Sequence, residues 1–250
     1  MLEALTAHAS HIGGRRRNED ACAYWLSDAG CCWCVADGAG GHGGGDVAAR
    51  LVVDHVLQGF SACPEVSVDS AARLIRTAHE EVMRAKQVHG ADDMHATCAL
   101  LLLDRQKQLA VWGHVGDSRV YLFREGLLVF QTRDHSLVQN MIDAGYGNTE
   151  MIRTHPQRSL LTSAIGNAGE LELSIAAEPL PVQAGDQFLL CSDGWWEYVR
   201  EDTMQLKLAD SADVDIWLSS MADLIACDGK PNHDNYTAIA VSLAAALPAS

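Results

Sequence analysis

The chain has 250 residues, of which 48% are hydrophobic and 20% charged, and no Pro- or Ser-rich linker divides it. This composition is typical of a globular chain with a sizeable core, and the length allows one large domain or two small ones. The formal charge of −15, from 33 acids against 18 bases, repels nucleic acid and anionic membrane surfaces, so we expect neither as a partner.

The first half of the chain predicts strands, then two helices, then strands again. Strand patterns cover residues 3–9, 20–27 and 31–37. Apolar residues at three- and four-residue steps predict helices over 44–60 and 67–88. Strand patterns then return in four segments, 95–103, 108–116, 118–124 and 127–131.

The second half begins with a short predicted helix over 136–144 and a polar excursion loop over 145–158. Two strands near 171–177 and 186–191, two helices near 201–209 and 211–226, and a strand over 236–243 follow. We expect Ser211 to cap the last helix. Strands and helices are grouped without regular alternation, which favours an α+β fold of antiparallel sheets covered by helices over a doubly wound parallel sheet.

Eight cysteines stand at positions 22, 31, 32, 34, 63, 98, 191 and 227. The first residues lack the basic start and apolar core of a signal peptide, and the longest apolar run is far shorter than the ~20 residues of a membrane span. We therefore expect a cytoplasmic chain whose reduced thiols mostly serve as small core residues. The run "CCWC" lacks the paired spacing of a zinc site.

The stretch "CVADGAGGHGGGDVAA", Cys34–Ala49, places a glycine-rich loop between a predicted strand and a predicted helix. Such loops commonly cradle phosphate through backbone amides. A P-loop, however, needs Gly-Lys-Ser/Thr at its end, and this loop ends in Gly-Gly-Asp with no lysine nearby. A nucleotide-binding function is therefore opposed by the sequence.

Acidic residues at strand ends offer a different chemistry. Apolar strands run into Asp37, Asp117 and Asp193 in tight turns, and Glu19 and Asp234 stand in polar turns beside strands. Any one of them could be an ordinary turn residue. Gathered at one end of a sandwich, five acids would repel each other unless cations intervened, and an all-oxygen ligand set suits Mg²⁺ or Mn²⁺.

Seven motifs in order carry a resemblance to a known family. They are "RRRNEDA", "VADGAGGHGGGDVA", "GHVGDSRVYLF", "TRDHSLVQNMIDAG", "THPQRSLLTSAIG", "GDQFLLCSDGWWEYV" and "DNYTAIAV". Together they span about residues 11 to 243 and resemble the metal-dependent Ser/Thr protein phosphatases of type 2C (the PPM family) in their compact bacterial form. The resemblance implies one catalytic domain over 1–250, a β-sandwich of two antiparallel sheets flanked by helices on both faces, and a flap around 145–158.

Carried over motif by motif, the resemblance also implies a set of site residues. Asp37 would bridge two metal ions, with the carbonyl of Gly38 and Glu19 completing one ion, and Asp193 and Asp234 holding the other. Asp117 and Asp193 would bind a third ion. Arg15, four residues before Glu19, would grip the substrate phosphate, and Asn235 would steady the ligand set from behind it. The ions would be Mn²⁺ or Mg²⁺.

The implied reaction is hydrolysis of phosphoserine and phosphothreonine by direct attack of a hydroxide that bridges the two ions. Animal members carry a proposed acid, a histidine, two residues after the bridging aspartate, where this chain has Ala39. His42 fits the bacterial pattern as a loop-fixing residue. The proton donor is therefore open, with a metal-bound water as the preferred candidate. His95, which replaces a usual glycine, has no functional explanation in the sequence.

We expect a monomeric phosphatase that acts on phosphorylated Ser/Thr proteins and reverses a bacterial Ser/Thr kinase in signal transduction. The alternative is a catalytically silent relative that binds or scaffolds phosphoproteins. Such relatives usually lose ligand acids, whereas this chain keeps all five. The tandem Trp195 and Trp196 predict packing, with one side chain in the core and one partly exposed.

Overall fold

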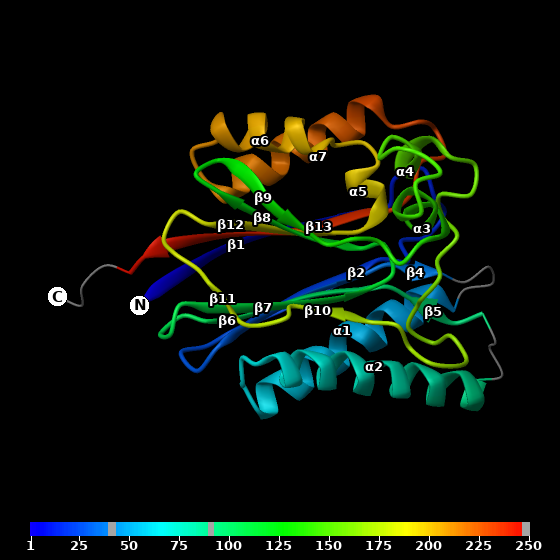
Figure 1. The fold of residues 1–250 in the computed structure, drawn as a ribbon, viewed down its shortest axis with the longest axis horizontal. Helices are drawn as coiled ribbons and strands as arrows, with labels where there is room; N and C mark the ends of the chain where they lie inside the picture. Colours follow the sequence, from blue (N-terminus) through cyan, green and yellow to red (C-terminus); the bar gives the residue numbers. More distant parts are fainter. Residues whose placement is uncertain (40–43, 90–92, 247–250) are drawn as a thin grey trace.

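The computed structural model describes residues 1–39, 44–89 and 93–246. Its elements stack in four layers (Figure 1). Helices α1 (Gly45–Ala62) and α2 (Val68–His89) cover the outer face of one sheet, and α6 (Glu201–Ala209) and α7 (Val214–Asp228) cover that of the other. The two sheets face each other between these helical layers.

Every strand pair is antiparallel. One sheet has the order β1 (Leu2–His11), β13 (Tyr236–Ala245), β12 (Gln187–Cys191), β8 (Arg119–Arg124) and β9 (Leu127–Gln131). The other has the order β10 (Ser174–Ile175), β7 (Leu109–Val115), β6 (Cys98–Asp104), β3 (Cys31–Ala36) and β2 (Ala21–Leu26), with β11 (Leu180–Pro181) also on β7. A small pair, β4 (Gly38–Ala39) and β5 (His95–Ala96), lies beside them. The predicted α+β sandwich flanked by helices is confirmed.

Strand β3 contributes side chains to two hydrophobic cores, one on each of its faces. All six of its residues are buried because the strand is covered on both faces. Alternate side chains point to opposite faces of a strand. Cys31, Trp33 and Val35 accordingly pack between the sheets, whereas the residues between them pack under α1 and α2. The third core lies between the first sheet and α7, around Trp217.

The cysteines mostly follow the prediction. Cys31, Cys32, Cys34, Cys98 and Cys191 are buried, whereas Cys63 and Cys227 are exposed. Burial raises the pKa of the Cys191 and Cys32 thiols, which keeps them protonated and unreactive.

Four local predictions are corrected by the structure. Asp213, not Ser211, caps α7, since its side chain accepts the amide of Ile216. The strand expected over 171–177 is reduced to the two residues of β10. The loop expected over 145–158 contains the short helix α4 (Met151–Thr154), and α3 (Leu137–Asp143) precedes it. Trp195 and Trp196 are both buried, because α5 (Asp193–Trp196) packs into the core beneath α7.

The pairing of β1 with β13 brings distant parts of the chain together. It extends over all ten residues, from Leu2 opposite Ala245 to His11 opposite Tyr236. The segment after β1 therefore lies beside the segment before β13, and both reach the same end of the sandwich. None of the described helices is both long and apolar enough to cross a membrane.

Candidate active site

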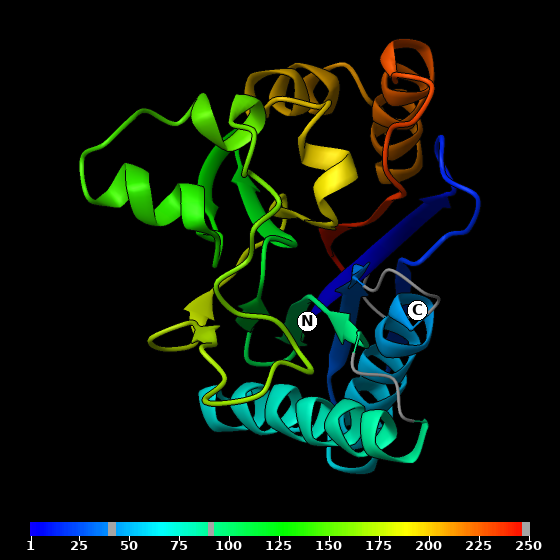
Figure 2. The ribbon, with the colours of Figure 1, turned by 90° about the vertical axis from the view of Figure 1, so that its right-hand side faces the viewer.

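One end of the sandwich carries a cavity of about 320 Å³. Figure 2 looks onto this end, with the helical layers above and below and the α3–α4 segment at one side. All eight predicted site residues line this cavity: Arg15, Glu19, Asp37, Gly38, Asp117, Asp193, Asp234 and Asn235. These residues come from five separate segments of the chain, and the fold brings them together at one cavity.

Asp37 follows the last residue of β3 and is fixed through its backbone. Its amide donates to Thr97 Oγ1 at 2.9 Å, and its carbonyl accepts from the amide of Thr97 at 2.8 Å. The Thr97 hydroxyl also lies 2.6 Å from Ser118 Oγ, next to Asp117. Thr97 thus ties the ends of three strands together at the cavity.

Gly38 is a position where only glycine fits. A Cβ atom there would lie 2.2 Å from the carbonyl oxygen of Gly45 and 2.6 Å from that of Glu19. The missing side chain lets the start of α1 approach the chain beside Asp37. A Cβ on Gly45 would in turn meet a Glu19 carboxylate oxygen at 3.0 Å. Gly38 and Gly45 therefore allow close packing around the acids.

Asn235 holds the segment that carries Glu19. Its side-chain oxygen accepts from the Glu19 amide at 2.8 Å, and its side-chain nitrogen donates to the carbonyls of Ile12 and Arg17 at 2.7 and 2.9 Å. The φ of Gly13 is +59°, and a Cβ there would lie 2.1 Å from the Asp234 carbonyl oxygen. The two segments joined by the β1–β13 ladder are thus locked together at the cavity.

Asp193 begins α5 and is buried, and its Oδ1 atom has no hydrogen-bond partner. The residue before it, Ser192, donates from its hydroxyl to Asp20 Oδ2 at 2.8 Å. Asp20 is a polar member of this site that sequence reasoning missed. Its place next to Glu19 and directly before β2 was the available signal.

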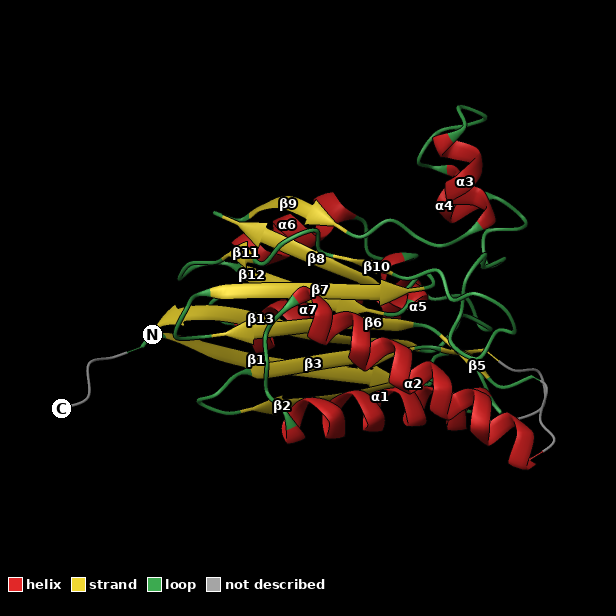
Figure 3. Ribbon diagram, turned by 60° about the horizontal axis from the view of Figure 1, so that its bottom comes forward, coloured by secondary structure: helices red, strands yellow, loops and turns green. Residues whose placement is uncertain are grey.

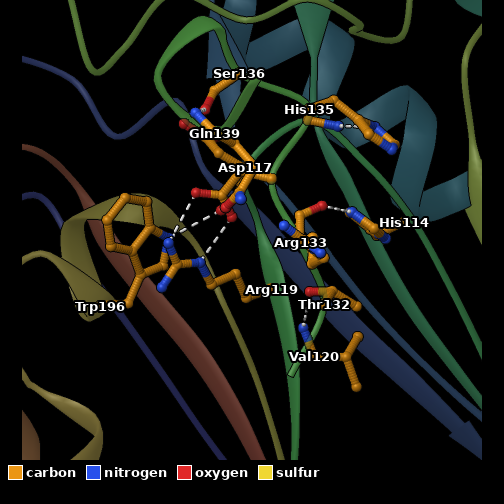
Figure 4. A network of polar contacts seen from close by, with 12 residues as sticks. His114, Asp117, Arg119, Val120, Thr132, Arg133, His135, Ser136, Gln139 and Trp196 are labelled. Carbon is orange, nitrogen blue, oxygen red and sulfur yellow. Dashed lines mark hydrogen bonds and ion pairs between the residues drawn. The ribbon is translucent and has the colours of Figure 1, made fainter. Parts of the chain in front are cut away.

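Asp117 stands after β7 and is positioned through its backbone by Trp196. The Trp196 indole nitrogen donates to the Asp117 carbonyl at 2.8 Å, and the Arg119 guanidinium lies 3.7 Å from the centre of a Trp196 ring (Figure 4). Arg119 is itself held by two 2.7 Å hydrogen bonds to Asp134. The buried tryptophan therefore links the cavity to a buried ion pair.

The cavity carboxylates repel each other. Burial, and then the neighbouring carboxylates, raise the pKa of Asp37 and of Asp193 well above the ordinary value. Burial, and then Asp134, raise the pKa of Asp117 to about 7, and burial raises that of Asp20 to about 6. Each raised pKa means that the charged carboxylate is disfavoured where it stands.

An oxygen-only donor set of this kind fits a hard divalent cation. The buried Asp193 Oδ1 atom has no hydrogen-bond partner and could bind a cation. A cation would also stabilise the charged forms of Asp37 and Asp193, whose pKa values are raised. Within the described ranges, no three His, Cys, Asp or Glu side chains form a ready-made metal-binding group. An ion here would therefore also use the Gly38 carbonyl and water, as Mg²⁺ and Mn²⁺ commonly do.

Arg15 lines the cavity and pairs with Asp234, with a guanidinium nitrogen 2.5 Å from a carboxylate oxygen. Its side chain is 53% exposed, so it remains accessible from solvent. Arg16 and Arg17 are also exposed but do not line the cavity. This difference agrees with the separate role that the spacing predicts for Arg15.

Ala39 lies at the cavity, and His95 is directly opposite it in the β4–β5 ladder. The His95 Nε2 atom lies 3.4 Å from Lys86 Nζ on α2, whose ammonium donates to the Gly166 carbonyl. His95 is thus engaged with the end of α2, which still leaves it without a catalytic role. His42 lies outside the described residues.

The α3–α4 segment stands apart from the sheets at the cavity end (Figure 3). Arg153 of α4 makes two 2.9 Å hydrogen bonds to Glu201, and Arg158 donates to Glu197 at 2.6 Å. These ion pairs fasten the predicted flap to the region of α5 and α6. Its residues 153, 154, 158 and 159 border a second cavity next to the first.

The family model of protein phosphatase 2C matches residues 8–233. This chain belongs to that family. The predicted family and enzyme class, a phosphoprotein phosphatase, are therefore confirmed, and the fold described above is that of the family.

Curated relatives and solved structures agree. The serine/threonine phosphatase stp of Listeria monocytogenes is 32% identical over 191 residues, which are 72% of this chain and 75% of that protein. PppA of Pseudomonas aeruginosa, described as a key regulatory component of T6SS, is 33% identical with a TM-score of 0.78 and covers 96% of this chain and 97% of its own. The PstP catalytic domain, solved with two manganese ions, is 26% identical with a TM-score of 0.82 over 98% of this chain and 100% of that one.

Proposed function

We propose that residues 1–250 form one type 2C catalytic domain that hydrolyses phosphoserine and phosphothreonine in proteins, with 145–158 as the flap. The observation that carries this proposal is the gathering of mutually repelling buried carboxylates in one cavity beside Arg15. Such repulsion destabilises a fold, and perturbed carboxylates in a cleft are typical of functional sites.

In this proposal the cavity holds Mn²⁺ or Mg²⁺, as the manganese-bound PstP neighbour suggests. Asp37 would serve two of the ions, Gly38 and Glu19 would complete the ligands of one, Asp193 and Asp234 would hold the other, and Asp117 with Asp193 would hold a third. When bound, the ions supply an activated water and positive charge for the phosphoryl oxygens.

Residues of the protein bind the phosphate and hold the proposed ligands in place. Arg15 offers its guanidinium to two phosphoryl oxygens and so orients the phosphate. Thr97 holds the Asp37 backbone, and Asn235 holds that of Glu19, so the ligands keep their positions during turnover. Ala39 has no proton to give to the leaving oxygen, and we propose that water supplies it.

A phosphothreonine peptide and a chromogenic aryl phosphate test this function. We expect turnover of both with Mn²⁺, its loss with EDTA, and its return when Mn²⁺ is restored in excess. Heat-unfolded protein with Mn²⁺ is the control for hydrolysis by the free ion. Absence of metal-dependent turnover on either substrate would favour the alternative, a silent relative that binds phosphoproteins.

We further propose that this chain acts as a monomer in the cytoplasm and reverses a bacterial Ser/Thr kinase. Its charge of −15 argues against nucleic acid and anionic membranes as partners. The likeness to PppA makes phosphoproteins of a secretion system the first substrates to test, by phosphoproteomics of a deletion strain.

A further inference from the structure

A second cavity of about 610 Å³, here called the flanking cavity, adjoins the carboxylate site. Its walls include residues 153, 154, 158 and 159 in and beside the flap, residues 197 and 198 directly after α5, and residues 230, 232 and 233 of the loop between α7 and β13. Arg15, Ser159, Asp193 and Asp234 line both cavities. A peptide with its phosphate at the carboxylate site therefore has the flanking cavity beside it for its neighbouring residues.

The cations of the flanking cavity differ in what they already bind. Three arginines are engaged with carboxylates: Arg15 with Asp234, Arg153 with Glu201 and Arg158 with Glu197. Within the part of the chain that the structure describes, the ammonium of Lys230 has neither a hydrogen bond nor an ion pair. It is exposed and lines the same cavity.

The backbone at Lys230 is firmly held. The amide of Gly229 donates to the Ile225 carbonyl at the end of α7. The Lys230 carbonyl accepts from the amide and the Nδ1 atom of His233, at 2.9 and 2.6 Å, and the His233 carbonyl accepts from the Gly14 amide at 3.0 Å. The lysine thus stands at a fixed point four residues before Asp234, on the same loop as a proposed ligand.

An unpaired cation at this place has an electrostatic consequence. The chain has an excess of acids, so anionic segments are repelled over most of its surface. At the flanking cavity, an acidic side chain of a substrate would meet Lys230 without displacing an existing ion pair. The three engaged arginines offer no such free partner.

We propose that the flanking cavity recognises an acidic side chain, a carboxylate or a second phosphate, next to the phosphorylated residue of the substrate, and that Lys230 is its contact. This inference rests on the proposed phosphatase function and names its substrate class. An exposed ion pair corresponds to roughly a two- to fivefold preference in kcat/KM for a carboxylate. A second phosphate, with its larger charge, gives a larger preference.

The test uses matched phosphothreonine peptides in which one position, from three residues before to three after the phosphothreonine, is Glu, Gln, Lys or phosphoserine. For wild type with Mn²⁺, we expect at least one position where kcat/KM is highest with phosphoserine, lower with Glu, and lowest with Lys. In every peptide kcat/KM refers to loss of the phosphothreonine phosphate, which fragment mass spectrometry distinguishes from loss of the phosphoserine phosphate. The phosphoserine arm then separates recognition of a second phosphate from that of a carboxylate.

Two variants and a matched control assign the preference. Lys230→Ala should bring the Glu-to-Gln ratio of kcat/KM close to one, and Lys230→Glu should invert the order so that the Lys peptide is preferred. Lys107→Ala removes the same charge from the β6–β7 turn, from which β7 runs toward the cavity end (Figure 3), and should keep the wild-type ratio.

The outcomes are distinct. A wild-type enzyme that turns over all peptides without an acidic preference, or a Lys230→Ala variant that keeps the preference, overturns this inference alone. No metal-dependent turnover of any peptide overturns the proposed function, and this inference with it.

Discussion

Two buried groups of charges lie within one hydrogen-bonded network, and the chain treats them in opposite ways. In one, Arg119 and Asp134 are joined by two 2.7 Å hydrogen bonds, and the guanidinium also donates to the Tyr121 hydroxyl at 2.9 Å. In the other, half-buried Asp37 and buried Asp193 lie among further carboxylates, and burial and then these carboxylates raise their pKa values. The first group is neutralised within the fold, and the second is not.

Trp196 connects the two groups, since it stacks under Arg119 and donates to the backbone of Asp117. The difference between them indicates what each is for. A charge that only supports structure is stable when its partner is part of the same chain. A set of acids left without protein cations keeps its attraction for cations that arrive from solution.

The largest effect is expected where an unneutralised acid is lost. Asp37→Asn and Asp193→Asn should each lower turnover with Mn²⁺ by about 10³-fold or more, because each removes a proposed shared ligand. The free energy of unfolding in EDTA should not fall, since a repelling charge is removed. Phosphopeptide kinetics and urea unfolding measure the two effects, and near-wild-type turnover in either variant would contradict the ligand assignment.

In the neutralised group, loss of the acid should lower the free energy of unfolding. Asp134→Asn leaves the buried Arg119 charge with only its longer, 3.4 Å contact to Glu201 and should lower the free energy of unfolding by about 3 kcal/mol. Urea unfolding in EDTA, with Asp37→Asn as the matched comparison, measures the contrast. If Asp134→Asn cost no more stability than Asp37→Asn, the two groups would not differ as described.

A smaller effect is expected at Arg15, a protein cation that pairs with Asp234, one of the proposed metal ligands. A charge-assisted hydrogen bond contributes about 1.5–3 kcal/mol, so Arg15→Ala should lower kcat/KM by roughly ten- to a hundredfold. Arg15→Lys should recover part of this loss. Arg16→Ala and Arg17→Ala are the controls and should stay within a few-fold of wild type; a larger loss in Arg17→Ala than in Arg15→Ala would mean that the motif is misaligned.

The last prediction concerns pH. Asp117 has a pKa of about 7 in the fold and an ordinary value of 3.8, so the folded state binds more protons between these values. Its contribution to stability is therefore present at low pH and is lost as pH rises through this range, by about 1 kcal/mol per pH unit at most. In EDTA, the stability difference between wild type and Asp117→Asn should fall from pH 4 to pH 7.

The comparison with Asp117→Asn isolates the contribution of Asp117, because both proteins contain His114. The pH dependence from His114 has the opposite sign. Burial, and then His135, lower the pKa of His114 to about 3, so its contribution to stability rises with pH up to about 6.5 in both proteins. Mn²⁺ should reverse the wild-type slope, since metal ligands bind as deprotonated carboxylates. A stability difference that does not change with pH would mean that Asp117 is not protonated in the fold.

Sequence reasoning predicted the strands, the long helices and the acids at strand ends from local patterns. It took the sandwich with helices on both faces, and the site roles of Arg15, Gly38 and Asn235, from the resemblance to the phosphatase family. The acids at strand ends and the glycines beside them are readable along the chain, and the long helices follow from their apolar spacing. What it missed depends on distant contacts. Asp20 accepts a hydrogen bond from Ser192, which lies far away in the sequence, and Trp196 is covered by Arg119, which is also distant in the sequence.

Short elements were also beyond prediction. Helix α4 has four residues, too few for a periodic pattern, and its place depends on the ion pair of Arg153 with Glu201. The choice of Asp213 over Ser211 as the cap of α7 depends on which residue turns the backbone, a difference of two positions that composition does not resolve.

The ladder between β1 and β13 has a consequence for how the protein is made. During translation β1 emerges long before β13, which is its one partner in that sheet among the described residues. Such non-local pairing folds slowly and leaves an unpaired edge exposed to other nascent chains. Asp234 and Asn235 emerge just before β13, so the carboxylate cavity is assembled only after nearly the whole of this sequence has left the ribosome.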